Sequence, residues 1–270
     1  MKKQYIHIVL LLSVMLSIGQ LQAEEAVPDD LQLRLGAYLL ADQSTDVKLS
    51  NKGLGVTINL QDTFEMESAA QVLRFDGYYR FNPRHAVEFS WYRIHNTSHT
   101  DKDFSFGDVN NSNHATLETF FNTDIYKVNY LYSFYHTDKV ELALGAGLHI
   151  TALDVGVKGD VTTDNGAKVN GESAKFTAPL PVVGFRLQYN ILPELSVKYA
   201  VDYFFITFDG ATGTLNDSLL TVDYRITRHF GMGVGFNSTR MRLEADVGDE
   251  SKLNVNHDVA GGLVYATMNF

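Results

Sequence analysis

Long segments in which apolar and polar residues alternate run along most of the chain. In one of them, alternate positions on one face read Val140, Leu142, Leu144, Ala146, Leu148 and Ile150. The positions between them are mostly polar or small, and residues 195–205 repeat the pattern. A period of two predicts β-strands with one apolar face. Segments of about 11 residues fit a tilted strand that crosses a bilayer, whereas strands in soluble proteins average about 5–6.

Ten such strands are predicted, and the segments between them alternate in length. The strands cover residues 31–42, 69–81, 85–98, 115–135, 138–154, 173–189, 193–208, 215–227, 229–245 and 257–270. The longer connections, rich in Asp, Asn, Gly, Ser and Thr, cover residues 43–68, 99–114, 155–172, 209–214 and 246–256. Tight turns at one rim and longer loops at the other predict an all-β, transmembrane, antiparallel up-and-down barrel, with short periplasmic turns and longer extracellular loops.

Two segments do not fit the simple ten-strand pattern. Residues 56–60 alternate like a strand inside the first long connection, so they either extend the first hairpin above the membrane or indicate a barrel of eight or twelve strands. Pro179 and Pro181 fall inside the sixth predicted strand. Because proline has no N–H to donate to a ladder, that strand is expected to begin near Val182 or to carry a bulge.

The N-terminus has the layout of a secretory signal peptide. Lys2 and Lys3 precede an apolar run from Ile6 to Ile18, and Ala23 offers a small residue at a cleavage position. We therefore expect residues 1–23 to be a signal peptide and residues 24–270 to form a single barrel domain. The alternative is an N-terminal membrane anchor, although the run is shorter than the roughly 20 residues that a bilayer requires.

Aromatic residues mark the end of the chain and one rim of the predicted barrel. The last strand ends at Phe270 and alternates backward through Met268, Ala266 and Val264. A terminal Phe on such a face resembles the signal that the barrel-assembly machinery reads. Aromatic residues close to the short turns predict a girdle at the periplasmic interface; they are Tyr79, Phe81, Phe134, Tyr189, Tyr224, Phe230 and Phe270.

Composition narrows the classes of function. The chain has no cysteine, which removes disulfides, thiolate catalysis and Cys-based metal sites. Its formal net charge is −10, and loss of Lys2 and Lys3 with the signal peptide makes the mature chain more acidic still. Nucleic-acid binding needs basic patches, so we do not expect it. The acidity is attributed to solvated loops, and no cofactor is expected.

If the apolar face meets lipid, the opposite face lines the lumen, and it carries a nearly balanced set of charges. The predicted lumen residues are Arg74, Asp76, Arg80, Glu88, Lys127, Glu141, Arg186, Lys198, Asp202, Asp223 and Arg225. Buried charges are unfavourable unless they are paired, so the set predicts a network of ion pairs across the lumen. Such a network would close a narrow barrel by polar packing, or would act as a selectivity filter or gated pore.

Five local motifs together indicate a resemblance to a known class of proteins. They are the segments 74–81 (RFDGYYRF) with Pro83 and His85, 89–92 (FSWY), 132–135 (YSFY), 139–142 (KVEL) and 147–149 (GLH). Together they resemble proteobacterial outer-membrane barrels with a generic outer-membrane β-barrel domain, broadly similar to OmpA-type and OmpW-type barrels. The resemblance spans the mature chain and implies a monomeric membrane barrel, with no catalytic residues to transfer. OmpW-type barrels have eight strands, so ten departs from their pattern.

Catalytic and metal-binding motifs are weak. Outer-membrane lipases and deacylases pair a Ser with a His in a His-x-Ser-Asn context, and Asn237-Ser238-Thr239 has no His two residues before the Ser. Acidic residues and a His lie toward the predicted extracellular rim, as in omptin-type proteases, but without a matching motif: Asp42, Asp154, Asp209, Asp246 and His149. His95, His99 and His114 are candidate ligands for Zn²⁺ or Cu²⁺, although His95 and His99 lie about 13 Å apart on an extended strand. The sequence thus predicts neither an enzyme nor a metal site.

The combined expectation is an integral protein of the outer membrane of a Gram-negative cell. We predict a barrel without enzymatic activity, closed by its ion-pair network, with a structural or surface-interaction role. The alternatives are a small pore or channel for small or hydrophobic solutes and, more remotely, a surface enzyme. The expected partners are outer-membrane lipid and lipopolysaccharide, the barrel-assembly machinery with periplasmic chaperones, and no nucleic acid.

Overall fold

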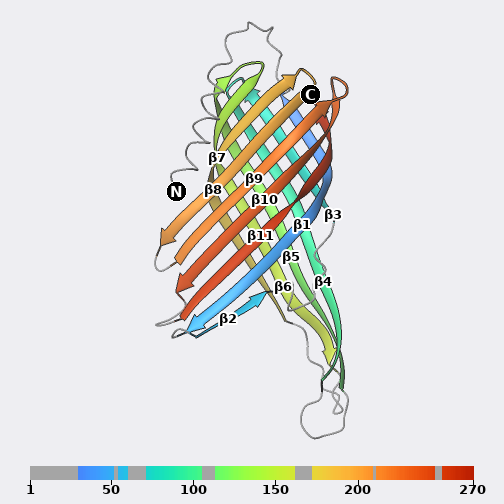
Figure 1. Ribbon diagram of the computed structural model, residues 1–270, viewed down its shortest axis with the longest axis vertical. Helices are drawn as coiled ribbons and strands as arrows, with labels where there is room; N and C mark the ends of the chain where they lie inside the picture. Colours follow the sequence, from blue (N-terminus) through green and yellow to red (C-terminus); the bar gives the residue numbers. More distant parts are fainter. Residues whose placement is uncertain are drawn as a thin grey trace, which may run out of the picture.

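Ten long strands form one antiparallel sheet that closes on itself in the computed structural model (Figure 1). The structure describes residues 30–51, 54–59, 71–104, 113–161, 172–208, 211–246 and 251–270. The barrel strands are β1 (Leu31–Asn51), β3 (Gln71–Asn82), β4 (His85–Phe104), β5 (Asn113–His136), β6 (Val140–Val161), β7 (Glu172–Leu192), β8 (Leu195–Phe208), β9 (Ala211–Arg225), β10 (Phe230–Asp246) and β11 (Ser251–Asn269). The predicted closed ten-stranded antiparallel barrel is confirmed.

The first and last strands close the ring. β1 pairs with β11 from Gln32↔Asn269 to Asn51↔Ser251, with one irregularity between Leu40 and Asp42. At the end of the chain, Leu31 N–H donates to the Phe270 carbonyl at 3.1 Å, and Phe270 N–H donates to the Leu31 carbonyl at 2.9 Å. Closure removes the sheet edges that lipid could not satisfy, which is the condition for spanning a membrane with strands.

The strands run further than the sequence pattern indicated. β1 reaches Asn51, β4 reaches Phe104 and β6 reaches Val161, so much of the predicted loops 43–68, 99–114 and 155–172 is paired strand. The short β2 (Leu54–Asn59) pairs with residues 46–51 of β1 and extends the first hairpin. The predicted boundaries were wrong here because backbone pairing continues where the side chains of a hairpin turn polar on both faces.

The prolines of β7 sit in an unbroken ladder on one side only. Pro179 and Pro181 pair with Ile150 and Leu148 of β6 without a register shift, so the expected bulge and the expected start near Val182 were wrong. On the other side, the pairing of β7 with β8 ends at Val183↔Tyr203. A strand edge without a partner tolerates residues that cannot donate, which explains two prolines in one strand.

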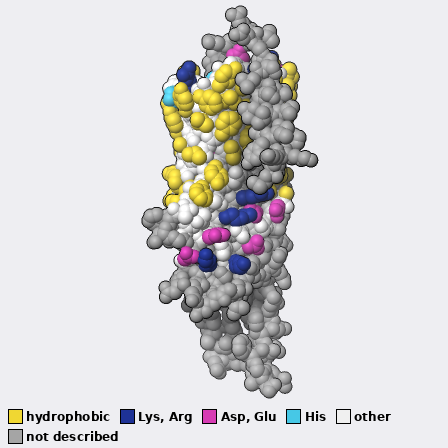
Figure 2. Space-filling view, turned by 60° about the vertical axis from the view of Figure 1, so that its left-hand side comes forward, with side chains coloured by type: hydrophobic (Ala, Val, Ile, Leu, Met, Phe, Trp, Pro, Cys, Tyr) yellow, Lys and Arg dark blue, Asp and Glu magenta, His cyan; other side chains and the backbone are white. Residues whose placement is uncertain are grey.

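The outward face is apolar in a broad band next to the short turns. Figure 2 shows this band, with Lys, Arg, Asp and Glu side chains gathered beyond its border. Exposed apolar side chains include Leu144, Val222, Val234 and Val264. Of the predicted girdle residues, Tyr79, Phe81, Phe134, Tyr224, Phe230 and Phe270 are exposed at this rim, and Tyr189 is half-buried.

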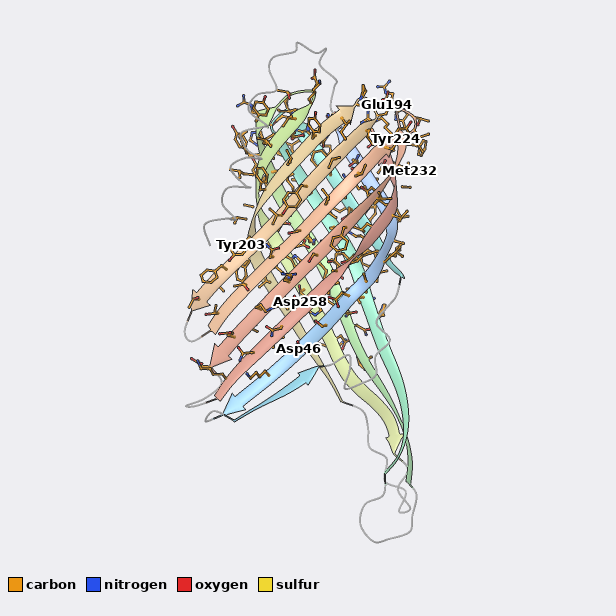
Figure 3. The ribbon with its side chains drawn as sticks, in the orientation of Figure 1. Asp46, Glu194, Tyr203, Tyr224, Met232 and Asp258 are labelled. Carbon is orange, nitrogen blue, oxygen red and sulfur yellow. The ribbon has the colours of Figure 1, made fainter. Side chains whose placement is uncertain are left out.

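Asp46 and Asp258 lie toward the other end of the barrel from Met232 and Tyr224 (Figure 3). Within the described ranges, no helix has the length and apolar character to cross a membrane.

Candidate functional site

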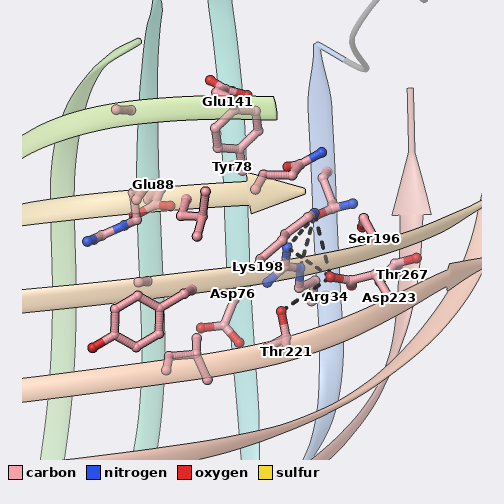
Figure 4. Close-up of a pocket in the computed structure, with 18 of the residues that line it drawn as sticks. Arg34, Asp76, Tyr78, Glu88, Glu141, Ser196, Lys198, Thr221, Asp223 and Thr267 are labelled. Carbon is pink, nitrogen blue, oxygen red and sulfur yellow. Dashed lines mark hydrogen bonds and ion pairs between the residues drawn. The ribbon is translucent and has the colours of Figure 1, made fainter. Parts of the chain in front are cut away.

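A cavity of about 570 Å³ lies inside the barrel and reaches the rim of short turns (Figure 4). Residues of two turns, among them Asp138 and Pro193, contribute to its wall. All eleven residues that the sequence placed in the lumen line it: Arg74, Asp76, Arg80, Glu88, Lys127, Glu141, Arg186, Lys198, Asp202, Asp223 and Arg225. Ten are buried or half-buried and Arg225, at the rim, is exposed. The alternation of each strand turns these side chains inward.

Asp223 of β9 is the centre of one cluster. Its carboxylate lies 3.9 Å from Arg34 of β1 and 3.6 Å from Lys198 of β8. It also accepts hydrogen bonds from Tyr265 Oη at 3.0 Å and from Thr221 Oγ1 at 3.3 Å. Figure 4 shows Arg34, Lys198 and Thr221 converging on this carboxylate. Four groups on four strands thus hold one acid.

Arg186 of β7 joins two carboxylates on different strands. Its Nε donates to Glu88 of β4 at 2.8 Å, and its Nη2 donates to Asp202 of β8 at 2.8 Å. Closer to the rim, Arg80 of β3 pairs with Glu141 of β6 at 2.6 Å. The contacts Arg186–Glu88 and Arg80–Glu141 connect strands that are not neighbours in the sheet, so they bind separate parts of the wall to one another.

A chain of polar contacts crosses the whole lumen. Arg74 of β3 pairs with Asp76 at 3.0 Å and donates from Nη1 to Asn237 Oδ1 of β10 at 2.7 Å. Asn237 Nδ2 donates to Asp217 Oδ1 of β9 at 2.8 Å, and Asp217 pairs with Lys127 of β5. We call these five residues the lumen belt. It runs from the β3–β5 wall to the β9–β10 wall and back.

An apolar cluster fills the lumen beside the belt. Its buried members are Tyr38, Val72, Tyr92, Ile94, Ile125, Val259, Leu263 and Tyr265. The guanidinium carbon of Arg74 lies 4.9 Å from the centre of the Tyr92 ring, so belt and cluster are in contact. The sequence did not predict this cluster, because assigning the apolar face to lipid leaves only polar residues for the inside.

Two charged members of the network were also missed. Asp217 is buried and six residues from Asp223 on the same strand, so the period of two places it on the inner face. Arg34 alternates with Leu33 and Leu35 in the same way. The signal was therefore available in both strands.

Glycine lets one large side chain of the lumen lie flat on the wall. A Cβ on Gly233 would come within 2.4 Å of the Tyr265 ring, and a Cβ on Gly36 would come within 2.4 Å of Tyr265 Cβ. Tyr265 crosses these two positions to reach Asp223. Hydrogen at both positions is what leaves room for that hydrogen bond.

The residues considered for catalysis or metal binding are dispersed. His149 points into the lumen, fully buried opposite Lys127 in the ladder, rather than standing at the rim. His95 contacts Asn122 Oδ1 at 2.8 Å, and the side chains of His99 and His114 lie outside the described residues, as does Asp209. Within the described part of the chain, no three His, Asp or Glu side chains gather as a metal site requires.

Comparisons with known proteins define the fold. No family model matches the sequence, and no curated protein matches it. The outer-membrane protease OmpT from Escherichia coli matches with a TM-score of 0.58 and 12% identity, over 92% of this chain and 99% of OmpT. The attachment invasion locus protein Ail of Yersinia pestis, in complex with a heparin analogue, also matches, with a TM-score of 0.32 and 11% identity over 89% of this chain and 99% of Ail. The toluene transporter TodX of P. putida matches with a TM-score of 0.37 and 10% identity over 90% of this chain and 91% of TodX.

The prediction that the protein is not an enzyme has to be corrected. A protease has this barrel fold, so a barrel of this shape is compatible with a catalytic site. The prediction rested on missing sequence motifs, and a motif cannot reveal residues that only the closed barrel brings together. At 12% identity the likeness concerns the fold and transfers no activity. The chain has the fold of a closed, ten-stranded outer-membrane β-barrel.

Proposed function

We propose that the protein is an outer-membrane barrel that does not conduct through its axis and that acts as a structural or surface-interaction element. The lumen belt carries this proposal, because its contacts join opposite walls with no gap between Asp76 and Lys127. The apolar cluster beside it adds large buried side chains to this barrier. A cavity that meets such a barrier is a vestibule and not a channel.

The pairing of charges supports a permanent barrier. Within the belt, Arg74 and Lys127 each have an acidic partner, and Asp217 accepts further hydrogen bonds from Asn237 and from Thr239 Oγ1 at 2.6 Å. A buried carboxylate with several donors is held in place, because breaking any one contact leaves an uncompensated charge. Opening the lumen would require several such contacts to break at once.

The outer surface supports placement in the outer membrane. Beyond the apolar band, β10 and β11 present Arg240, Arg242 and Asp258 on the outside, and Arg242 pairs with Asp258 at 2.6 Å. Lipid headgroups and lipopolysaccharide would meet this polar border. The proposal includes export by residues 1–23, recognition of Phe270 by the barrel-assembly machinery with periplasmic chaperones, and a monomeric protein.

Single-channel conductance in planar bilayers tests the proposal. The wild-type protein is expected to be silent, and Arg74→Ala, which removes the contact across the lumen from β3 to Asn237 of β10, is expected to conduct. Glu141→Ala is the matched control, because Glu141 also lies in the lumen but pairs with Arg80 at the rim and not in the belt. Heat-dependent electrophoretic mobility shows that each variant is folded. Reproducible openings of the wild-type protein would overturn the closed lumen and favour the channel.

A further inference from the structure

The wall of the barrel is open between two neighbouring strands at the end away from the short turns. Pairing of β7 with β8 stops at Val183↔Tyr203. Both strands continue: β7 stays paired with β6 as far as Glu172↔Val157, and β8 stays paired with β9 as far as Phe208↔Ala211. Among the described residues, nothing pairs the two strands beyond Val183. We call this interval, Leu180–Val182 on β7 and Phe204–Ile206 on β8, the seam.

The residues of β7 at the seam cannot easily close it. Pro179 and Pro181 are exposed and have no N–H, so neither can donate to a neighbouring strand. Two missing donors within three residues would leave β8 carbonyls without partners if the ladder were completed. The two prolines in β7 therefore account for the open interval.

The seam interrupts the usual division between the two faces of the wall. Where the ladder is still closed, on the short-turn side of the seam, β8 carries the charged Asp202 inward and Tyr203 outward. At the seam, by contrast, Val182 and Phe204 are buried inward while Pro181 and Phe205 are exposed outward, so both faces are apolar. Apolar surface thus passes from the outside of the barrel to its inside.

A group of apolar side chains lies directly inside the seam. Val182 and Phe204 pack with Leu215 of β9, and Leu180 and Met241 lie against them. Next to this group, a Cβ on Gly213 would be in ordinary contact with Phe204 at 3.4 Å and Ile206 at 3.5 Å, so the glycine leaves room for about one methyl group among these apolar side chains. Polar side chains of the lumen belt lie on other positions and do not contribute to this lining.

The seam adjoins the apolar band. Tyr203 lies nearer the short-turn end than Asp258 and Asp46 in Figure 3. The outward Val183 and Phe205 are both exposed, which suits contact with hydrocarbon and not with water. The opening therefore starts at the level of the leaflet on the loop side.

We propose that the seam is a lateral portal through which an acyl chain of a lipid in that leaflet reaches the apolar lining inside the barrel. This activity is additional to the closed axis proposed above: the chain enters sideways and the belt still blocks passage to the short-turn end. The occupant is hydrocarbon because the route offers apolar surface on both faces and lacks two backbone donors that a polar or peptide ligand would need.

Tryptophan fluorescence quenching in the full-length protein tests the portal. The chain has one tryptophan, so Trp91→Phe gives a dark background. In that background, Phe204→Trp reports the inside of the seam, Phe205→Trp the lipid face, and Tyr38→Trp an inward position whose strand is paired on both sides. Each variant is refolded into phosphatidylcholine vesicles with or without bromine on the acyl chains.

A portal predicts a loss of Phe204→Trp fluorescence in brominated vesicles comparable with that of Phe205→Trp, while Tyr38→Trp keeps its intensity. Attaching a bulky maleimide to Pro181→Cys, exposed at the seam, should restore the Phe204→Trp signal; the same label on Arg240→Cys should not. Quenching of Phe204→Trp no stronger than that of Tyr38→Trp overturns the portal, as does quenching that the Pro181 label leaves unchanged. Val182→Trp replaces Phe204→Trp if that variant does not fold. These results are independent of conductance, so the two proposals can fail separately.

Discussion

Lys127 of β5 and Asp217 of β9 meet inside the lumen although 90 residues separate them in the chain. Both side chains are buried, and Asp217 also accepts from Asn237 and Thr239. Removing one partner leaves the other charge buried and uncompensated. We therefore expect Lys127→Met and Asp217→Asn each to lower the free energy of unfolding by about 3–5 kcal/mol. Urea unfolding in detergent micelles measures it.

The double variant Lys127→Met/Asp217→Asn distinguishes a coupled pair from two separate effects. Since it removes both charges, its loss of stability should be well below the sum of the single losses. A strictly additive result would contradict the coupling, and Glu141→Ala, in a different ion pair, serves as the control that should add to either single variant.

Gly233 tests how tightly Tyr265 is held. Gly233→Ala forces the Tyr265 ring away from the wall and from Asp223, because the new Cβ would lie within 2.4 Å of the ring. We expect a loss of about 1–3 kcal/mol in the free energy of unfolding, as for other overpacked sites. Gly262→Ala is the matched control, since the nearest atom to its Cβ would be 3.9 Å away. Equal losses at both positions would show that glycine is not needed for packing there.

The alternation of apolar and polar residues was enough to predict the fold and most of the site. In a membrane barrel one face of each strand meets lipid, so every second residue of Val140–Ile150 and Leu195–Phe205 is apolar and shows which face points outward. The same alternation assigned the eleven predicted charges to the inner face, and all of them line the cavity.

The alternation predicts nothing where the two faces of a strand are alike, both apolar or both polar. Tyr38, Tyr92 and Leu263 lie inward although they are apolar, and strand ends such as Lys102–Phe104 are paired although they read as loop. The meeting of Lys127 with Asp217 depends on the curvature and register of the closed sheet and is not a property of any one segment. The two prolines of β7 are visible in the sequence, but only the register shows that they lie where β7 has no pairing with β8.

The border of the apolar band on the side away from the short turns lies between Phe236 and Arg240. Both residues face outward on β10 and both are exposed. Because the chain has no cysteine, single cysteines report on their own surroundings. In vesicles, Arg240→Cys should react with a membrane-impermeant maleimide and Phe236→Cys should not, whereas both should react after unfolding in urea. Rapid labelling of Phe236→Cys would move the border and shorten the membrane-spanning segment.

His257 makes stability depend on pH. It lies on β11 beyond the apolar band, buried beside Asp258 and Arg242 and 2.9 Å from Thr45 Oγ1. Burial lowers the pKa of His257 to about 4, more than Asp258 raises it. Between about pH 6.5, where an unfolded histidine titrates, and about pH 4, the unfolded chain binds the additional proton, so stability rises with pH in that window.

The contribution of His257 to the free energy of unfolding should therefore be complete above about pH 6.5. It should decline by on the order of 3 kcal/mol as the pH falls to about 4. Comparing the free energy of unfolding of the wild-type protein and His257→Asn across this range isolates it. The variant should be less sensitive to pH, whatever its stability at neutral pH. Parallel pH profiles would show that folding does not lower the pKa of His257.

Phe270 separates folding from assembly. Its backbone closes the barrel by two hydrogen bonds with Leu31, which any residue can make. Its side chain is exposed on the lipid face, with the His229 ring 6.2 Å away. Phe270→Ala should therefore change the free energy of unfolding by about 1 kcal/mol or less, because little packing is lost. In cells, the same change should strongly reduce the folded protein in the outer membrane if the assembly machinery reads this ring.

Phe230→Ala is the matched control, since Phe230 is an equally exposed aromatic at the same rim but lies away from the chain terminus. Unfolding in micelles and the amount of heat-modifiable protein in outer-membrane fractions are measured for both variants. A selective loss of membrane protein for Phe270→Ala, with both variants stable in micelles, identifies a signal. Equal losses for the two variants would mean that the girdle as a whole matters and that the terminal ring carries no separate information.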